Sequence, residues 1–507
     1  MRPNNIENCG LQDLMSEIGA KLISGKSAGI AVTGISLNTN SVEADDIYLA
    51  LPGAKTHGAK YSDKAIAAGA IAVLTDEAGL QFLKDIEVPI YEVDDPRGQI
   101  GAIAAKIYGT ENKTPKMFGI TGTNGKTTTS YFIRSLLTAF DNKTGLIGTI
   151  EIVADDEPIP SVLTTPEAND VHAILGIMNE KNVSAAVMEV SSHALEFDRV
   201  ANVMFDVVGF TNLTQDHLDL HGTMEEYFKR KAELFTKKHA RKGVAIIDSE
   251  WGEKLIAEAD IDCVSLALEG KEADWTLTDC KRRNIGHDFT LQHKDGTKLE
   301  VAVGLPGFFN VANAALATVM VAESGVDIGK LQCVLTEAKP FFTDVPGRMQ
   351  VISHQPAAIV DFAHNPNAMV LAMEAVTPPT KEGKLIIVFG ATGERDVTKR
   401  EDMGRIAVEG ASVIIITDDD PHGEPAAPIR DQVEKGAIAA AQSKTDVKIL
   451  NIAPRSKAIE HAVKIATDKD TILVAGRGHE TIQEVMGEDL ELDDREILRQ
   501  ALGIDSK

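Results

Sequence analysis

Short, nearly uninterrupted apolar runs recur along the chain and alternate with longer segments whose apolar positions follow a helical spacing. Such runs are 185–190 and 203–210 in the middle of the chain, and 384–390, 413–417 and 471–476 towards the C-terminus. Strands of a parallel sheet are covered by helices on both faces, so they are apolar on both sides. The pattern therefore predicts an α/β fold with parallel sheets, the last of them doubly wound.

Two polar segments interrupt this pattern. Both Tyr108–Lys116 and Glu337–Gly347 contain proline and glycine, which favour turns, and we place domain boundaries there. A chain of 507 residues is long enough for roughly three domains. We expect a smaller N-terminal α/β domain at 1–111, a central domain with a P-loop ATPase-type parallel sheet at 112–342, and a Rossmann-like doubly wound domain at 343–507.

Composition argues against several partners and compartments. The formal charge is −25, from 51 basic and 76 acidic residues, so no sequence-wide excess of cations would attract a nucleic acid or an anionic membrane. The four cysteines show neither metal-ligand spacing nor a disulfide framework, which fits a reducing cytoplasm. No apolar run approaches the span of about 20 residues that a membrane helix needs. We therefore expect a cytoplasmic protein without membrane insertion.

The most specific motif is Gly122-Thr-Asn-Gly-Lys-Thr-Thr128, which follows an apolar run and begins a helical pattern. Its glycines let backbone N–H groups approach phosphate oxygens, Lys126 can reach the β- and γ-phosphates, and the Thr127 hydroxyl can bind Mg²⁺. The strict G-x-x-x-x-G-K-[ST] spacing is not met, because Ile120 stands where the first glycine should fall. A nucleotide-phosphate loop is the favoured interpretation, and a glycine-rich turn without a ligand is the alternative.

Acidic residues and histidines follow the apolar runs downstream of this loop. Glu189 lies at the end of the run 185–190, where open α/β sheets hold ligands, and a carboxylate there suits Mg²⁺. The end of the next run carries a cluster of four residues: Asp216, His217, Asp219 and His221. Taken alone, this cluster is as consistent with a helix cap as with a metal site. Its position after a phosphate loop favours the metal site.

Several motifs occur in the order found in the Mur ligases, and on this resemblance the chain is identified as a member of that family. They are Gly122-Thr-Asn-Gly-Lys-Thr-Thr128, Thr164-Thr-Pro-Glu167, Glu189-Val-Ser-Ser-His193, Asp216-His-Leu-Asp-Leu-His-Gly222, Asn310-x-x-Asn313, Asp361-Phe-Ala-His364 and Gly476-Arg-Gly-His-Glu480. The resemblance covers the central and C-terminal regions and is thinner in the N-terminal region. It implies a ligase that couples ATP cleavage to amide formation. In that reaction a substrate carboxylate attacks the γ-phosphate, and an amine captures the acyl phosphate.

The resemblance also implies three sets of binding residues. The set for ATP is Gly122, Thr123, Asn124, Gly125, Lys126, Thr127, Thr128, Asn310, Arg348 and His364. The set for the acceptor, UDP-N-acetylmuramoyl-L-alanyl-D-glutamate, is Thr39, Thr164, Thr165, Ser191 and Arg199. The set for the incoming amino acid is Arg395, Asp419, Asp420, Pro421, His422, Gly476 and Glu480.

For the metal and the chemistry, the resemblance implies Mg²⁺ held by Thr127, Glu189, His217 and Lys231, with Lys126, Lys231 and His217 as catalytic residues. Lys231 matches a lysine that CO₂ converts to a carbamate in the family. An ammonium beside Mg²⁺ would repel the metal, whereas a carbamate supplies an anionic oxygen ligand. Because Lys229 and Arg230 precede Lys231, a solvated basic helix face is the alternative.

The sequence departs from the family pattern at three places. Phe197 stands where many relatives have glutamine, two residues before Arg199. The segment Leu37–Asn40 stands where many relatives have Leu-Asp-Ser-Arg, so Thr39 would replace the serine. The segment 390–400 has fewer glycines than in many relatives, although Arg395 and Asp396 are present.

The incoming amino acid is expected to be L-lysine. Relatives that use meso-diaminopimelate carry Asp-Asn-Pro-Arg in the recognition loop, where the arginine binds the distal carboxylate bidentately. This chain reads Asp419-Asp-Pro-His422, so the arginine is missing and Asp420 adds negative charge. L-Ornithine is the nearest competitor, since one methylene is worth only about 1–3 kcal/mol, and meso-diaminopimelate is the further alternative. An acidic turn with solvated carboxylates would also account for the charges.

Two other functions stay open at this point. A folylpolyglutamate synthase would ligate glutamate to folate, but the large region before the phosphate loop and the Thr-Thr-Pro-Glu run speak against it. A non-catalytic nucleotide-binding module would bind ATP without releasing phosphate when both other substrates are present.

Overall fold

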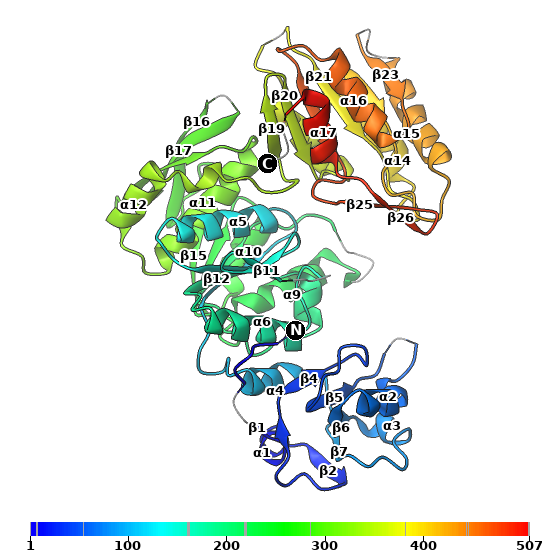
Figure 1. The fold of residues 1–507 in the computed structure, drawn as a ribbon. Helices are drawn as coiled ribbons and strands as arrows, with labels where there is room; N and C mark the ends of the chain where they lie inside the picture. Colours follow the sequence, from blue (N-terminus) through cyan, green and yellow to red (C-terminus); the bar gives the residue numbers. More distant parts are fainter. Residues whose placement is uncertain are drawn as a thin grey trace. The chain divides into compact units, whose positions relative to one another are not determined.

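The structure is a computed structural model that describes residues 2–6, 9–53, 55–159, 163–216, 221–283, 285–380, 382–442, 444 and 446–504 (Figure 1). Its contacts divide the chain into two compact units. Unit 1 comprises Met1–Thr278, Leu291–Leu299 and Ala315–Ala338, and unit 2 comprises Asp279–Thr290, Glu300–Ala314 and Lys339–Lys507. The domain boundaries near 112 and 342 stay a prediction.

The first part of unit 1 is a small sheet with helices on both faces. Its elements are β1 (Cys9–Gly10), α1 (Leu11–Glu17), β2 (Lys21–Ser24), β3 (Ala31–Val32), β4 (Gly34–Ser36), β5 (Asp46–Ala50), η1 (Gly58–Tyr61), α2 (Ser62–Ala67), β6 (Ala70–Thr75), α3 (Glu77–Leu80), β7 (Ile90–Glu92) and α4 (Ile100–Ile107). The sheet order is β2-β7-β6-β5-β4, with β4 to β7 parallel and β2 antiparallel to β7. Along β5, Ile47 and Leu49 face one apolar core while Tyr48 and Ala50 face another, as expected for a strand covered on both sides.

The second part of unit 1 carries a larger sheet. Its elements are β8 (Lys116–Thr121), α5 (Lys126–Thr138), β9 (Thr144–Ile147), β10 (Ile152–Ala154), β11 (Glu157–Ile159), α6 (Ala168–Glu180), β12 (Ala185–Glu189), α7 (Ser192–Glu196), β13 (Val207–Phe210), α9 (Met224–Ala232), η2 (Glu233–Phe235), β14 (Lys242–Ile246), α10 (Glu250–Glu258) and β15 (Asp262–Ala267). The strand order β9-β12-β8-β13-β14-β15 is parallel throughout, which confirms the predicted parallel sheet. Helix α4 packs against α6, so both parts belong to one compact unit.

The sheet continues through strands whose residues are shared between the two units. These elements are β16 (Trp275–Arg283), β17 (Gly286–His293) and β18 (Lys298–Val303), followed by α11 (Phe308–Glu323), α12 (Ile328–Glu337) and η3 (Pro340–Phe342). The predicted strand at 203–210 begins later than expected, at Val207. Phe205 instead makes an isolated bridge with Ala240, so the extended segment is not one continuous strand.

Unit 2 contains the doubly wound sheet predicted for the C-terminal region. Its elements are β19 (Gln350–His354), β20 (Ala357–Asp361), α13 (Pro366–Val376), β21 (Leu385–Phe389), α14 (Lys399–Gly410), β22 (Val413–Ile416), α15 (Ala426–Ala441), β23 (Lys448–Asn451), α16 (Arg455–Ile465), β24 (Thr471–Ala475), β25 (Ile482–Val485), β26 (Glu488–Glu491) and α17 (Asp494–Leu502). The order is β19-β20-β24-β21-β22-β23, and only the β19–β20 pair is antiparallel among the described strands of this sheet.

Alternating residues of β21 show that both faces of this sheet are buried. Leu385, Ile387 and Phe389 pack with residues of α13, α14 and α15, whereas Ile386 and Val388 pack with residues of α16 and α17. Figure 1 shows α14, α15, α16 and α17 around this sheet. This arrangement is why the strand reads as a continuous apolar run, and it confirms the α/β fold class.

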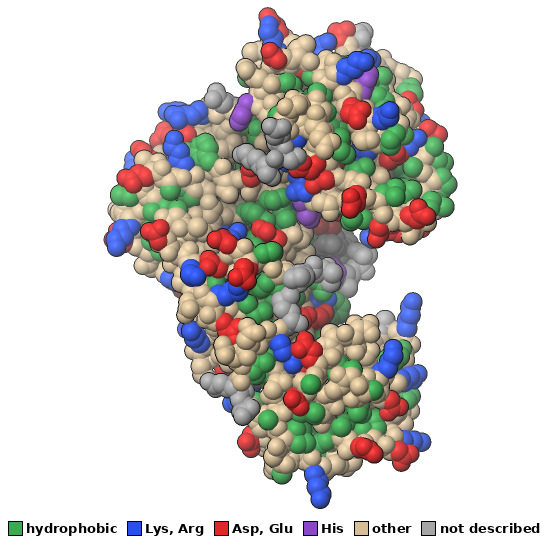
Figure 2. All heavy atoms as spheres, viewed as in Figure 1, with side chains coloured by type: hydrophobic (Ala, Val, Ile, Leu, Met, Phe, Trp, Pro, Cys, Tyr) green, Lys and Arg blue, Asp and Glu red, His purple; other side chains and the backbone are tan. Residues whose placement is uncertain are grey.

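The described part of the chain contains no helix that is both long and apolar enough to span a membrane. Figure 2 shows acidic and basic side chains interspersed over the face in view.

Candidate active site

The phosphate loop lies between β8 and α5 and has the backbone that its glycines predict. Gly122 and Gly125 have φ values of 146° and 89°, which L side chains rarely adopt. A Cβ on Gly122 would lie 1.9 Å from the Thr211 hydroxyl oxygen, so only glycine fits there. The Nζ of Lys126 donates hydrogen bonds to the carbonyls of Gly122 and Thr123, both at 2.9 Å. The lysine is therefore held across the loop at the N-terminus of α5.

The neighbouring loop after β13 fixes the middle of the phosphate loop. The backbone N–H of Thr123 donates to the carbonyl of Asn212 at 2.9 Å, and the N–H of Asn124 donates to the Asn212 side chain at 3.1 Å. Thr128 is buried in the first turn of α5. All seven predicted residues of the loop are thus held at the carboxyl edge of the parallel sheet, where such sheets bind ligands.

Glu189 is placed beside this loop by strand register. It pairs with Ile120 across the parallel β12–β8 ladder, and its side chain is fully buried. The Thr127 hydroxyl donates to Glu189 Oε2 at 2.8 Å, while the backbone N–H and the hydroxyl of Thr149 donate to the carboxylate at 2.9 Å and 3.0 Å. Thr149 was not predicted, because nothing in its local sequence marks it.

The donor chemistry of this corner fits Mg²⁺. Mg²⁺ prefers oxygen ligands and uses one or two carboxylates together with substrate phosphates and water. The Thr127 hydroxyl and the Glu189 carboxylate meet that requirement next to the phosphate loop. His217, the third predicted ligand, lies outside the described residues. Within the described ranges, no group of three or more His, Cys, Asp or Glu side chains forms a metal cluster.

Lys231 reaches the phosphate loop from α9. Its side chain is buried, its Nζ donates to the Gly122 carbonyl at 2.9 Å, and it lies 4.6 Å from the centre of the Tyr227 ring. Burial lowers the pKa of Lys231 well below its usual range; the positive charge of Lys126 lowers it further, and Asp216 opposes the shift. The alternative of a solvated basic face is wrong for Lys231, although Lys229 on the same helix is exposed.

The predicted acceptor residues in this part of unit 1 are connected to the end of β12. The Thr165 hydroxyl donates to the Glu189 carbonyl at 2.8 Å, and the N–H of Ser191 donates to the Thr165 hydroxyl at 3.4 Å. The side chain of Ser191 also caps α7. Thr149 joins Thr164 to the same corner by a hydroxyl hydrogen bond of 3.3 Å. Thr39 is half-buried in the loop after β4, and among the described residues no hydrogen bond joins it to Thr164, Thr165 or Ser191.

Arg199 belongs to a cluster that the sequence only partly indicates. Its guanidinium pairs with Glu167 at 3.0 Å, and Glu167 also pairs with Arg97 at 3.2 Å. The ring of Phe197 lies against both guanidiniums, at 5.7 Å from Arg199 and 5.9 Å from Arg97. The Nε of Arg199 is buried without a hydrogen-bond partner in the described part of the chain, so the hydrogen-bonding capacity of this guanidinium is not fully used. Phe197 thus supports arginines at the position where many relatives have glutamine.

The predicted ATP residues of unit 2 fall into two places. Asn310 is buried near the start of α11 and donates to the Pro306 carbonyl at 2.8 Å. The Arg348 guanidinium stacks on the Phe362 ring at 4.2 Å, and the ring of the exposed His364 lies 4.7 Å from the centre of the same Phe362 ring. Arg348 and His364 are therefore brought together by Phe362, which the sequence did not single out.

The predicted amino-acid residues come together where three loops meet at the carboxyl ends of β21, β22 and β24. A Cβ on Gly393 would lie 2.0 Å from the Pro421 carbonyl, and one on Gly476 would lie 2.6 Å from Asp419 Oδ2. The N–H of Gly393 donates to the Asp420 carbonyl at 2.8 Å. Arg395 is exposed on the loop before α14. These close approaches explain the glycines of two of the loops.

Two fully buried arginines beneath these loops were not predicted. Arg455 makes a bidentate pair with Asp494, at 2.8 Å and 2.7 Å, and donates to the Ala475 and Asp418 carbonyls. Arg477 pairs with Asp420 and donates to the Ile482 carbonyl. Arg477 lies within the Gly476–Glu480 motif, which is the one signal that could have identified it.

The carboxylates of this site are less completely paired. Asp419 is buried, and its Oδ2 has no hydrogen-bond partner in the described part of the chain; the nearest arginine atom, Arg455 Nη1, is 3.9 Å away. Burial raises the pKa of Glu480 to about 7, opposed by Arg477 and assisted by the charges of Asp419 and Asp420. The site therefore holds acidic groups that a cation would stabilise.

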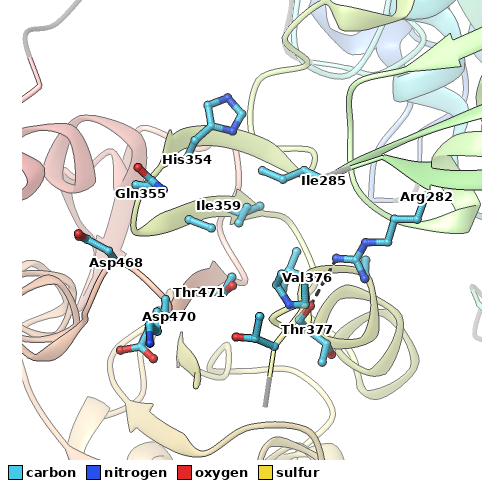
Figure 3. Close-up of a pocket in the computed structure, with 15 residues that line it drawn as sticks. Arg282, Ile285, His354, Gln355, Ile359, Val376, Thr377, Asp468, Asp470 and Thr471 are labelled. Atoms are coloured by element: carbon cyan, nitrogen blue, oxygen red, sulfur yellow. Dashed lines mark hydrogen bonds between the residues drawn. The ribbon is translucent and has the colours of Figure 1, made fainter. Parts of the chain in front are cut away.

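A separate cavity of about 1070 Å³ opens in unit 2 at the amino ends of β20 and β24 (Figure 3). It is lined by the first residues of β20 and β24 and by the end of α13, where Arg282 donates to the Thr377 carbonyl at 3.4 Å. None of the predicted site residues lines it.

Comparisons with known proteins agree with this arrangement. Three family models match the chain: the Mur ligase family catalytic domain at 31–108, the Mur ligase middle domain at 120–321, and the Mur ligase glutamate ligase domain at 347–478. The chain therefore belongs to the Mur ligase family.

Within that family the chain resembles the UDP-N-acetylmuramyl-tripeptide synthetase of Leifsonia xyli subsp. xyli. The two are 39% identical over 505 residues, which cover 99% of this chain and 97% of the relative. This chain is also 41% identical over 483 residues to the UDP-N-acetylmuramoyl-L-alanyl-D-glutamate–2,6-diaminopimelate ligase of Corynebacterium glutamicum. The match covers 93% of this chain and 92% of that relative. A solved structure of a ligase with that name has a TM-score of 0.69 and 27% identity, covering 98% of this chain and 99% of the other.

Proposed function

We propose that this Mur ligase uses ATP to join L-lysine to UDP-N-acetylmuramoyl-L-alanyl-D-glutamate, through an acyl phosphate. The observation that carries the ligase chemistry is the corner formed by the phosphate loop, Glu189 and Lys231. Lys126 and Lys231 both donate to the Gly122 carbonyl, and Thr127 donates to Glu189. Groups that bind triphosphate and groups that offer oxygen ligands thus meet at one helix N-terminus.

The roles of the residues follow from their charges. Lys126 and the N-terminal N–H groups of α5 would hold the phosphates and stabilise the negative charge that develops during phosphoryl transfer. Bound Mg²⁺ would supply electrostatic screening between the phosphates and the acceptor carboxylate. Thr127, Glu189 and a carbamate on Lys231 would hold it, together with His217. Arg199 would orient the acidic acceptor through the positive charge of its guanidinium.

The choice of L-lysine rests on the charges at the amino-acid site. Arg455 and Arg477 are already paired with Asp494 and Asp420. Asp419 and Glu480 supply acidic groups that suit a side-chain ammonium. The exposed Arg395 would serve the α-carboxylate that every candidate amino acid carries. Position 422 carries a histidine, which cannot bind a distal carboxylate through two parallel hydrogen bonds as an arginine at that position would.

meso-Diaminopimelate is the second candidate, and the names of the relatives favour it. Several proteins that are 33–41% identical to this chain are named as 2,6-diaminopimelate ligases. Those names support the same acceptor and the same reaction type, whichever of the two amino acids this chain uses. The local charges at Asp419, Asp420 and His422 are what favours L-lysine here.

An assay of ADP release tests the ligase itself. With ATP and Mg²⁺ present, sustained release should require both UDP-N-acetylmuramoyl-L-alanyl-D-glutamate and an amino acid. The acceptor carboxylate takes the γ-phosphate and leaves ADP, and the amine of the amino acid then displaces phosphate from the acyl phosphate, so that the enzyme can turn over again. Release stimulated by folate and glutamate instead would indicate a folylpolyglutamate synthase. Binding of ATP without release under any of these conditions would indicate a non-catalytic module.

A further inference from the structure

The recognition loop at 418–424 is held from outside by the β25–β26 hairpin, which the sequence analysis did not single out. His422 and Val485 form a parallel bridge, with the His422 N–H donating to the Glu484 carbonyl at 3.1 Å. The Met486 N–H donates to the His422 carbonyl at 2.7 Å. The Glu484 N–H donates to Asp420 Oδ1 at 3.2 Å. The hairpin therefore acts as an additional strand along the loop.

The side chains of His422 and Glu484 meet across this bridge. His422 Nδ1 lies 2.7 Å from Glu484 Oε2, and the two side chains are 23% and 46% exposed. The backbone of His422 has a φ of 50°, in the left-handed region that few residues other than glycine adopt and in which histidine is enriched. The polar end of residue 422 is thus already matched with a carboxylate of the protein.

We propose that Glu484 is a specificity-determining residue. Its carboxylate forms the hydrogen bond with the side chain at position 422 that a second carboxylate of the incoming amino acid would need, and so excludes that carboxylate. The inference deepens the proposed function, on which it rests: the preferred substrate is a diamino acid with a single carboxylate. Glu484 acts through residue 422 and is a positioning residue, with no contact to the reacting atoms.

The physical basis is competition between two anions for one partner. Glu484 belongs to the same chain and is fixed by the bridge, so its effective concentration at His422 exceeds that of a free ligand. A distal carboxylate would also lie near Glu484, and like charges held close together repel each other. An arginine introduced at position 422 would face the same carboxylate and could form a bidentate pair with it. Replacement of His422 alone should therefore be insufficient to create a site for meso-diaminopimelate.

A double-mutant cycle tests this proposal. The enzymes are the wild type, Glu484→Gln, His422→Arg and the double variant, each assayed for kcat/KM with L-lysine and with meso-diaminopimelate. We expect each single change to raise the diaminopimelate-to-lysine ratio by roughly threefold, since the pair is partly exposed. The double variant should exceed the product of the two single effects by roughly tenfold, because the new arginine is then unpaired. Single effects that simply multiply would overturn the proposal.

Glu491→Gln is the matched control, because Glu491 is an exposed carboxylate of the same hairpin that faces Ile482 in register. It should leave the ratio unchanged; a change as large as that of Glu484→Gln would indicate a general effect of hairpin charge and contradict the proposal. If the arginine variants do not fold, the Glu484→Gln variant alone tests the proposal. An unchanged diaminopimelate-to-lysine ratio of kcat/KM in that variant refutes the role of Glu484. The wild-type ranking of the two amino acids separately tests the proposed function, so the two failures are distinguishable.

Discussion

Replacement of Lys126 by alanine should reduce kcat for ligation by about 10³-fold or more while leaving the fold intact. Lys126 is held across the phosphate loop by hydrogen bonds to the carbonyls of Gly122 and Thr123. Removing one preorganised group that stabilises transition-state charge costs about 10²–10³ in rate, and a full charge in a phosphate site is expected to reach the upper end. ADP release by the purified variant measures the effect.

Lys143→Ala is a matched control for this change. Lys143 lies in the same unit, is exposed, and pairs with Asp155 at 2.8 Å. Because exposed pairs contribute little to stability, this variant should keep wild-type activity and a similar melting temperature. Turnover of Lys126→Ala close to that of the wild type would refute the assignment of the phosphate loop.

Lys231→Ala should lose at least about 10²-fold in activity and recover part of it when short-chain carboxylates are added. A carbamate forms only on a neutral amine, and the pKa of Lys231 lies well below its usual value because the side chain is buried. The depressed pKa means that the neutral form is favoured as the pH rises through that value. Loss of a metal ligand or of its support typically costs 10–100-fold or more, and acetate in the vacated space would restore an anionic oxygen.

Lys229→Ala is the control for the second prediction. Lys229 lies on the same helix but is exposed and pairs with Glu226 at 2.8 Å. It should retain activity and show no response to acetate. Full activity of Lys231→Ala without added carboxylate would contradict the carbamate, and a loss without rescue in a folded variant would leave the lysine with a different role.

The fold was predictable where burial leaves a local pattern. Strands β12, β21, β22 and β24 are covered on both faces, so each reads as an apolar run and each was placed within a residue or two. The hairpin β25–β26 was not predicted, since every residue of Glu488–Glu491 is exposed and the segment has no apolar face that marks a strand.

The site was predictable where a motif sets local backbone geometry. Gly122 and Gly125 were identified from the motif, and their positive φ values in the structure give the physical reason for glycine at both positions. Arg455 was missed because arginine is rarely buried, and the Asp494 carboxylate that permits its burial is 39 residues away. The pairing of His422 with Glu484 spans 62 residues, so no local pattern could indicate it. The family resemblance singled out Lys231, but the run of basic residues does not by itself distinguish it from Lys229, and the structure does so by burying Lys231 on α9.

The most direct test of the account is a competition between amino acids. The wild-type enzyme would receive ATP, Mg²⁺, UDP-N-acetylmuramoyl-L-alanyl-D-glutamate, and equal concentrations of L-lysine, L-ornithine and meso-diaminopimelate, with the products resolved by mass. The acidic groups at Asp419 and Glu480, and the absence of an arginine at position 422, predict that the L-lysine product dominates. It should exceed the meso-diaminopimelate product by on the order of tenfold or more. A predominance of the meso-diaminopimelate product would contradict the account.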